Sequence, residues 1–137
     1  MNTVIVPVDF SETSLNAAKY AAQLLTGHYE VTMVLYHSYS KASEAESTTQ
    51  NLEKLKTELM KDHIVKIEVL AHEESDFVDG LEKAARHRRA DLVIMGTLGI
   101  SGLHDKIFGS KTAAVIGESK VPVLAIPLEY DWSSPGK

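Results

Sequence analysis

The sequence predicts a single α/β domain: one doubly wound open sheet of five parallel strands with helices on both faces. Two observations lead to this fold class. Short apolar runs typical of buried strands alternate four times with segments of helical spacing, and a fifth strand closes the pattern. The chain of 137 residues, 44% of them hydrophobic, is long enough to bury one core. Alternation of this kind favours parallel strands joined by right-handed crossovers.

The first strand is predicted at residues 4–8, a short run rich in β-branched side chains. Ser11 is placed to cap the helix that follows, and Glu12 is favourable in its first turn. Helical spacing then continues until Gly27, which supplies a stop signal. The apolar positions of this helix are Leu15, Ala18, Ala22 and Leu25.

The second strand is predicted at Val31–Tyr36, and the polar segment 38–49 after it is either a loop or a frayed helix start. The next helix is marked by Leu52, Leu55 and Leu59. Apolar residues then alternate with charged ones over residues 65–69, which indicates a more exposed edge strand.

The third helix is expected to begin near Ser75 or Asp76 and to end in the cationic run Arg86–Arg89. Its apolar positions are Phe77, Leu81, Ala84 and Ala85. The cationic run suits the dipole at a helix C-terminus, and we favour this interpretation over a nucleic-acid patch. Two more strands follow, at Leu92–Met95 and at Val121–Ile126, with a helix from about residue 110 between them. Pro122 indicates that the last strand lies at a sheet edge.

Composition excludes several classes of function. The chain has no cysteine, so disulfides, thiol catalysis and zinc–thiolate sites are excluded. No apolar run approaches the ~20 residues that span a membrane, and no signal peptide is recognisable, so a cytoplasmic protein without membrane contact is expected. The net charge of −5 argues against non-specific nucleic-acid binding. The six histidines have no metal-ligand spacing, so no metal site is predicted.

A glycine pattern follows the fourth strand: Gly96, two residues, Gly99, nine residues, then Gly109 and Ser110. A strand that breaks at Gly96 and leads through further glycines to a helix start can cradle a phosphate, because backbone N–H groups approach an anion closely there. The alternative is that these glycines only make tight turns. Ligands of doubly wound folds bind at the carboxyl ends of the strands, which are predicted at Asp9, His37–Ser38 and Gly96.

The chain resembles the universal stress protein family over nearly its whole length. The resemblance rests on residues 6–12, 35–38, 91–97, 99, 101–103, 108–110 and 121–124. The spacing of Gly96, Gly99, Gly109 and Ser110 matches the pattern of the ATP-binding branch of that family. The resemblance implies an adenine-nucleotide alpha hydrolase-like fold, with a domain over 1–128 and a tail over 129–137.

The resemblance also implies which residues bind the nucleotide. Adenine, ribose and α-phosphate would contact Pro7, Val8, Asp9, the backbone of Ser38, Gly96 and Gly99. The phosphates would be held by Gly109, Ser110, Lys111 and Thr112. Many relatives carry polar or basic residues where Leu98 and Ile100 stand, so Lys106 or Lys111 would have to supply the positive charge. The ligand is therefore ATP or another adenine nucleotide such as AMP, with or without Mg²⁺.

The function that this resemblance implies is ATP binding by a regulatory stress-response module, active as a homodimer through strand 121–126. No catalytic residue is predicted, since no base for in-line attack stands out and a Walker lysine motif is missing. One alternative is a slow ATPase or autophosphorylating protein with Ser110 or Thr112 near the γ-phosphate. Another is a dimeric interaction protein that does not depend on a nucleotide.

Overall fold

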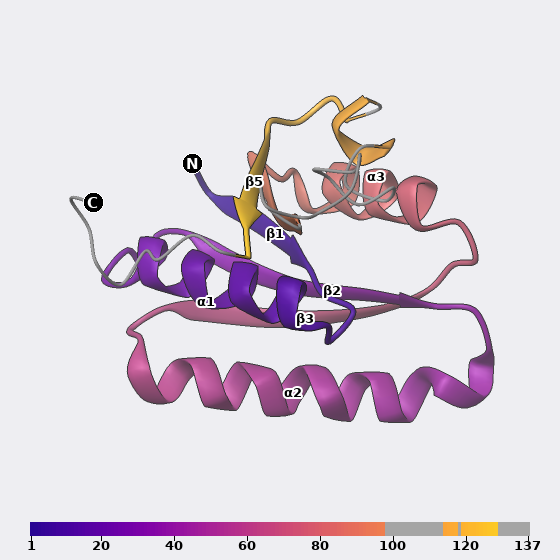
Figure 1. The fold of residues 1–137 in the computed structure, drawn as a ribbon, viewed down its shortest axis with the longest axis horizontal. Helices are drawn as coiled ribbons and strands as arrows, with labels where there is room; N and C mark the ends of the chain where they lie inside the picture. The colour runs from indigo at the N-terminus through magenta and orange to yellow at the C-terminus, as the bar shows by residue number, and fades with distance from the viewer. Residues whose placement is uncertain (98–113, 118, 129–137) are drawn as a thin grey trace.

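The computed structural model describes residues 1–97, 114–117 and 119–128 (Figure 1). These residues form one parallel five-stranded sheet in the order β3-β2-β1-β4-β5. The strands are β1 Thr3–Pro7, β2 Thr32–Tyr39, β3 Lys66–Glu73, β4 Leu92–Thr97 and β5 Val123–Pro127. The predicted fold class is confirmed, and β3 and β5 lie at the two edges as expected.

Helices cover both faces of the sheet (Figure 1). The helices α1, Glu12–Leu25, and α2, Ala45–Asp62, pack on one face around Val4, Val6 and Leu35. The helix α3, Phe77–Arg88, packs on the other face. That second core contains Ile5, Val34, Tyr36, Leu81, Val93, Met95 and Val115. None of the helices among the described residues is long and apolar enough to cross a membrane.

Helix α1 begins and ends as its sequence predicts. The Ser11 hydroxyl accepts a hydrogen bond from the Ser14 N–H at 3.2 Å, which satisfies one of the open donors of the first turn. Gly27 follows the helix with a φ of +84°, a conformation that favours glycine. The buried stripe between these ends is mostly alanine: Ala17, Ala18, Ala21 and Ala22. Small side chains let α1 lie close to the sheet.

Helix α2 starts earlier than the spacing of its leucines suggests. A short 3₁₀ turn at Ala42–Glu44 leads into α2 at Ala45, so most of the polar segment after β2 is helical. Thr48 is buried and extends the stripe of Leu52, Leu55 and Leu59 towards the N-terminus by one turn. A polar residue at a buried position conceals this turn from a hydrophobic pattern.

Two strands run further than predicted. Strand β2 continues through His37 and Ser38 to Tyr39 because β3 pairs with it as far as Glu73. Strand β4 continues through Gly96 to Thr97 because both residues pair with β5. The prediction that the strand breaks at Gly96 is therefore wrong.

The closing strand is shorter than predicted. Strand β5 begins at Val123, so Pro122 lies just before the strand and not within it. The Pro122 carbonyl still accepts a hydrogen bond from the Val93 N–H at 2.9 Å, which aligns β5 with β4. A residue without an N–H fits this place, since only its carbonyl is used.

Candidate functional site

The carboxyl ends of β1, β2 and β4 meet at one edge of the sheet. Strand β1 lies between β2 and β4. After β1 the next strand is β2, on the β3 side of the sheet, and after β4 the next strand is β5, on the other side. This is the switch point of a doubly wound sheet, where a crevice opens beyond the strand ends. The structure places Pro7, Val8, Asp9, Ser38 and Gly96 at this edge, as predicted.

Asp9 shapes the turn between β1 and α1. Its carboxylate oxygen Oδ1 accepts a hydrogen bond from the Ser11 N–H at 3.0 Å, and its own N–H donates to Ser14 Oγ at 3.2 Å. Between them Phe10 has a φ of +65°, a left-handed conformation that is uncommon for a bulky residue. The exposed Asp9 therefore has the turn role expected of an Asp before a capped helix. Contact with a ligand remains a prediction.

His37 connects the end of β2 to the end of β1. Its Nδ1 lies 2.7 Å from the Val8 carbonyl oxygen. Because a carbonyl can only accept, we infer that Nδ1 carries the proton and donates. The ring also contacts Phe10, with centroids 5.4 Å apart and planes tilted by 58°. Sequence reasoning noted His37 at a strand end but missed this pairing, and the left-handed Phe10 has no sequence signal.

The backbone of Ser38 faces the open side of β2, where β1 has ended. The Tyr36 carbonyl accepts from the Val8 N–H, and the Tyr39 carbonyl accepts from the Glu74 N–H. Backbone groups alternate between the two sides of a strand, so those of Tyr36 and Ser38 point towards β1. In a continued ladder, the Ser38 N–H would donate to the Val8 carbonyl. In the described residues that carbonyl accepts from His37 instead. The N–H and C=O of Ser38 thus face the side of β2 where β1 has ended.

Gly96 lies where α1 crosses β4. A Cβ at this position would stand 2.7 Å from Thr13 Cγ2 and 2.8 Å from the Thr13 backbone carbon. Both distances are shorter than packed atoms allow, and the backbone of α1 cannot easily move away. Helix packing alone therefore requires glycine here. The predicted contact of Gly96 with ribose or phosphate stays a prediction.

A buried tyrosine lies beneath this edge on the α3 side of the sheet. Burial, with a smaller contribution from the nearby Glu74 carboxylate, raises the pKa of Tyr36 to about 12. The hydroxyl lies 3.2 Å from His72 Nδ1 and also bonds to the Ser38 side chain. Tyr36 therefore stays protonated and holds the Ser38 side chain on the face away from α1. No cluster of His, Asp and Glu among the described residues could hold a metal ion.

The predicted phosphate contacts fall on a different part of the chain. Gly99, Gly109, Ser110, Lys111 and Thr112 lie outside the described residues, as do Lys106 and the tail 129–137. The described geometry therefore concerns the base and ribose half of the predicted site.

Comparisons with known proteins agree with this fold. A model of the universal stress protein family matches residues 1–127. Universal stress protein MJ0531 of Methanocaldococcus jannaschii is 26% identical over 136 residues, 90% of this chain and 80% of that protein. A universal stress protein solved in complex with cAMP has a TM-score of 0.74 and 25% identity, covering 93% of this chain and 97% of that one. The universal stress protein from Archaeoglobus fulgidus in complex with dAMP shares the fold, with a TM-score of 0.71, 20% identity and coverage of 92% and 97%.

Proposed function

Because the chain belongs to the universal stress protein family, we propose that it binds an adenine nucleotide at the carboxyl edge of β1, β2 and β4. The base would lie against Pro7 and Val8 with its edge on the Ser38 backbone. The ribose would lie near Asp9 and Gly96. The glycine-rich segment with Gly99, Gly109, Ser110, Lys111 and Thr112 would hold the phosphates. Binding would serve regulation in a stress response and not rapid turnover.

The observation that carries this proposal is the open backbone of Ser38. The alternation of backbone groups along β2 directs one N–H and one C=O of this residue towards the side where β1 has ended. Adenine presents an amino group that donates next to a ring nitrogen that accepts, and an adjacent carbonyl and N–H complement that pair. Backbone groups of this kind orient small ligands in otherwise apolar pockets. The 25% identical relative solved in complex with cAMP supports an adenine ligand.

Calorimetric titration of the full chain with ATP, AMP, cAMP and GTP tests the proposal. We expect the adenine nucleotides to bind and GTP to bind at least tenfold more weakly, a difference of about 1.4 kcal/mol. Guanine has a carbonyl where adenine has the amino group, so it would oppose the Ser38 carbonyl. Equal binding of GTP and ATP would contradict base recognition at this edge.

A pair of variants at one position tests the role of the backbone. Ser38→Pro removes the N–H that faces the crevice and leaves the β2–β3 ladder intact, because that ladder uses the neighbouring residues. Ser38→Ala keeps the N–H and removes only the hydroxyl. We expect Ser38→Pro to lose nucleotide affinity about tenfold and Ser38→Ala to retain it. Circular dichroism with thermal melting shows whether each variant is folded.

The preferred nucleotide and its turnover depend on the phosphate segment. Steady-state phosphate release with Mg²⁺ separates a binding protein from a slow ATPase that uses Ser110 or Thr112. We expect no release above the spontaneous rate. A clear rate that Thr112→Ala abolishes would favour the enzymatic alternative.

A further inference from the structure

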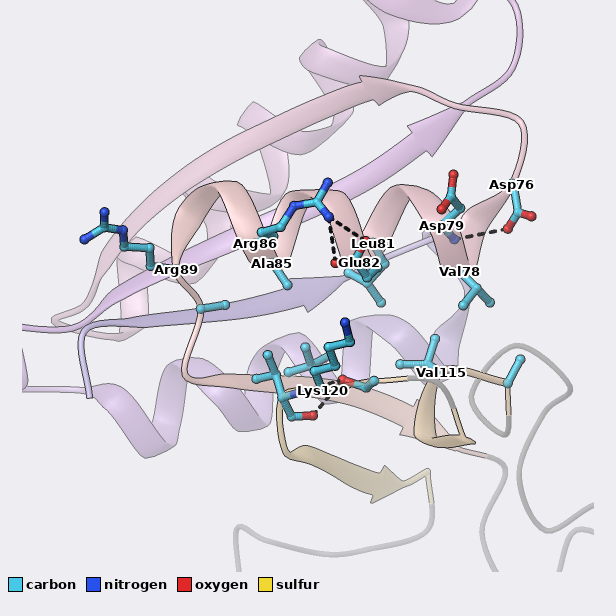
Figure 2. A pocket seen from close by; sticks show the side chains of 15 residues that line it. Asp76, Val78, Asp79, Leu81, Glu82, Ala85, Arg86, Arg89, Val115 and Lys120 are labelled. Atoms are coloured by element: carbon cyan, nitrogen blue, oxygen red, sulfur yellow. Dashed lines mark hydrogen bonds and ion pairs between the residues drawn. The ribbon is translucent and has the colours of Figure 1, made fainter.

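A cavity of about 660 Å³ lies between α3 and residues 114–121 (Figure 2). Its volume is typical of sites for small organic ligands. Its floor and walls are apolar: Val78, Leu81, Ala85, Val93, Val115 and Val121. None of the described residues of the proposed nucleotide site lines this cavity.

Charged side chains rim the cavity in two groups. Asp76, Asp79 and Glu82 lie along the first half of α3, and Arg86 and Arg89 lie at its end. This order suits the helix dipole and needs no ligand. Lys120 is different, because it comes from the turn before β5 and its side chain points across the gap towards α3 (Figure 2).

Hydrogen bonds brace the turn that carries the exposed Lys120. Ser119 Oγ donates to the Val121 carbonyl at 2.6 Å and accepts from the Val121 N–H at 3.1 Å, which braces the turn that carries Lys120. Lys120 forms no ion pair with any described residue. On α3, Arg86 contacts Glu82 only at 3.4 Å, a long ion pair that an anion can replace.

We propose that this cavity binds a small molecule with an aliphatic body and a single carboxylate. The aliphatic body of the ligand would cover the apolar floor beside Leu81, Val93 and Val115. Its carboxylate would bind Lys120 with help from Arg86. The three acidic side chains around the rim offset the three basic ones. The rim therefore has no excess of positive charge that would hold more than one negative charge. A polyanion such as a nucleotide would meet repulsion from Asp79 and Glu82.

Methyl NMR of the full chain with octanoate, 1-octanol and octylammonium tests this proposal. The three probes share one alkyl chain and differ only in the head group. We expect octanoate at millimolar concentration to shift the methyl resonances of Leu81, Val93, Val115 and Val121. We expect 1-octanol to bind about fivefold more weakly and octylammonium more weakly still, since Lys120 would repel a cation. Saturating AMP should leave these shifts unchanged, because no described residue of the proposed nucleotide site lines the cavity.

A matched pair of lysine variants locates the head group. Lys120→Gln should lower octanoate affinity about fivefold and leave 1-octanol affinity unchanged. Lys61→Gln, on α2 at the opposite face of the sheet, should change neither. The proposal is overturned if octanoate leaves the four residues unshifted, or if octylammonium binds as well as octanoate. Equal octanoate affinity in both lysine variants would also overturn it.

Discussion

The His37 imidazole donates to the Val8 carbonyl at 2.7 Å, and this bond takes the acceptor that a continued β-ladder would offer to Ser38. One side chain thus keeps the end of β1 attached to β2 while the β2 backbone beyond it stays open. The base half of the proposed nucleotide site depends on this exchange of partners.

Replacing His37 with Phe should weaken nucleotide binding. The new ring still packs on Phe10, but the Val8 carbonyl becomes available to the Ser38 N–H. We expect a loss of about tenfold in affinity, ~1.4 kcal/mol, by calorimetric titration with the nucleotide that binds best. His28→Phe is the control, since His28 is exposed in the turn after α1. Unchanged affinity in a folded His37→Phe protein would show that the imidazole bond does not govern the site.

Two glycines of one sequence pattern should respond differently to valine. Gly96→Val drives a side chain into the backbone of Thr13 and should lower the free energy of unfolding by at least ~2 kcal/mol. Gly109→Val should leave the protein folded and reduce ATP affinity at least tenfold, since a Cβ would crowd the phosphate. Urea titration and nucleotide titration of both variants separate the two effects. A stable Gly96→Val protein would contradict the described packing of α1 on β4.

Gly80→Ala should destabilise α3 even though alanine is the better helix former. A Cβ at Gly80 would lie 2.6 Å from Glu74 Cγ and 2.8 Å from the Tyr36 hydroxyl oxygen. We expect a net loss of about 1 kcal/mol, because this crowding outweighs the helix-propensity gain of ~1 kcal/mol. Gly117→Ala, whose new Cβ would meet no described residue outside its own turn of chain within 4 Å, is the matched control and should lose nothing. In a Tyr36→Phe background the loss at Gly80 should shrink.

Asp91 should make stability depend on pH in the acid range. Hydrogen bonds from the N–H groups of Asn2 and Thr3, at 2.6 and 3.0 Å, lower the pKa of its carboxyl below the ordinary value of 3.8. Because the pKa of Asp91 is lower in the folded state, its carboxylate stabilises the fold at pH values above the unfolded-state pKa. This stabilisation is lost as the pH falls through the folded-state pKa. Asp91→Asn should therefore be less stable than the native protein at pH 7, and the urea midpoints of the two proteins should converge as the pH falls through the folded-state pKa of Asp91. A difference that persists at low pH would argue against this carboxylate.

The edge of β5 should mediate a homodimer. The Pro122 carbonyl and the Leu128 N–H form hydrogen bonds with β4. Backbone groups along a strand point alternately to its two sides, and Ala125 lies three residues from each of these two. The N–H and C=O of Ala125 therefore point away from β4, towards the free edge. Ala125→Pro removes an outward N–H without touching the β4 ladder, whereas Ala125→Val keeps it. We expect light scattering to show a dimer for the native protein and Ala125→Val, and a monomer for Ala125→Pro. A monomeric native protein at tens of micromolar would refute the dimer.

Val123 is a poor place for that test. Charge at Val123 would disturb an interface, but this side chain packs against the core on the α3 side. Val123→Lys would therefore mix loss of folding with loss of assembly.

The order of strands and helices could be predicted because each element repeats its own period of apolar residues. Ser11 and the cationic end of α3 could be predicted because capping chemistry acts over a few residues. The extensions of β2 and β4 could not, since a strand continues for as long as a neighbour pairs with it. His37, Ser38 and Gly96 were assigned to the right edge. The exchange of partners at Val8 joins residues 29 positions apart and lies beside the left-handed Phe10, and local sequence indicates neither feature.

The projecting end of β2 has a consequence for how this site can change over evolutionary time. An N–H and a C=O belong to every residue type except proline, which has only the carbonyl. Position 38 can therefore exchange serine for many other residues while presenting the same two groups to the crevice. Recognition of a ligand by backbone groups therefore places little restriction on the residue type at the point of contact. The constraint falls instead on the residues that hold this segment in place, among them the preceding His37 and the β3 partner His72.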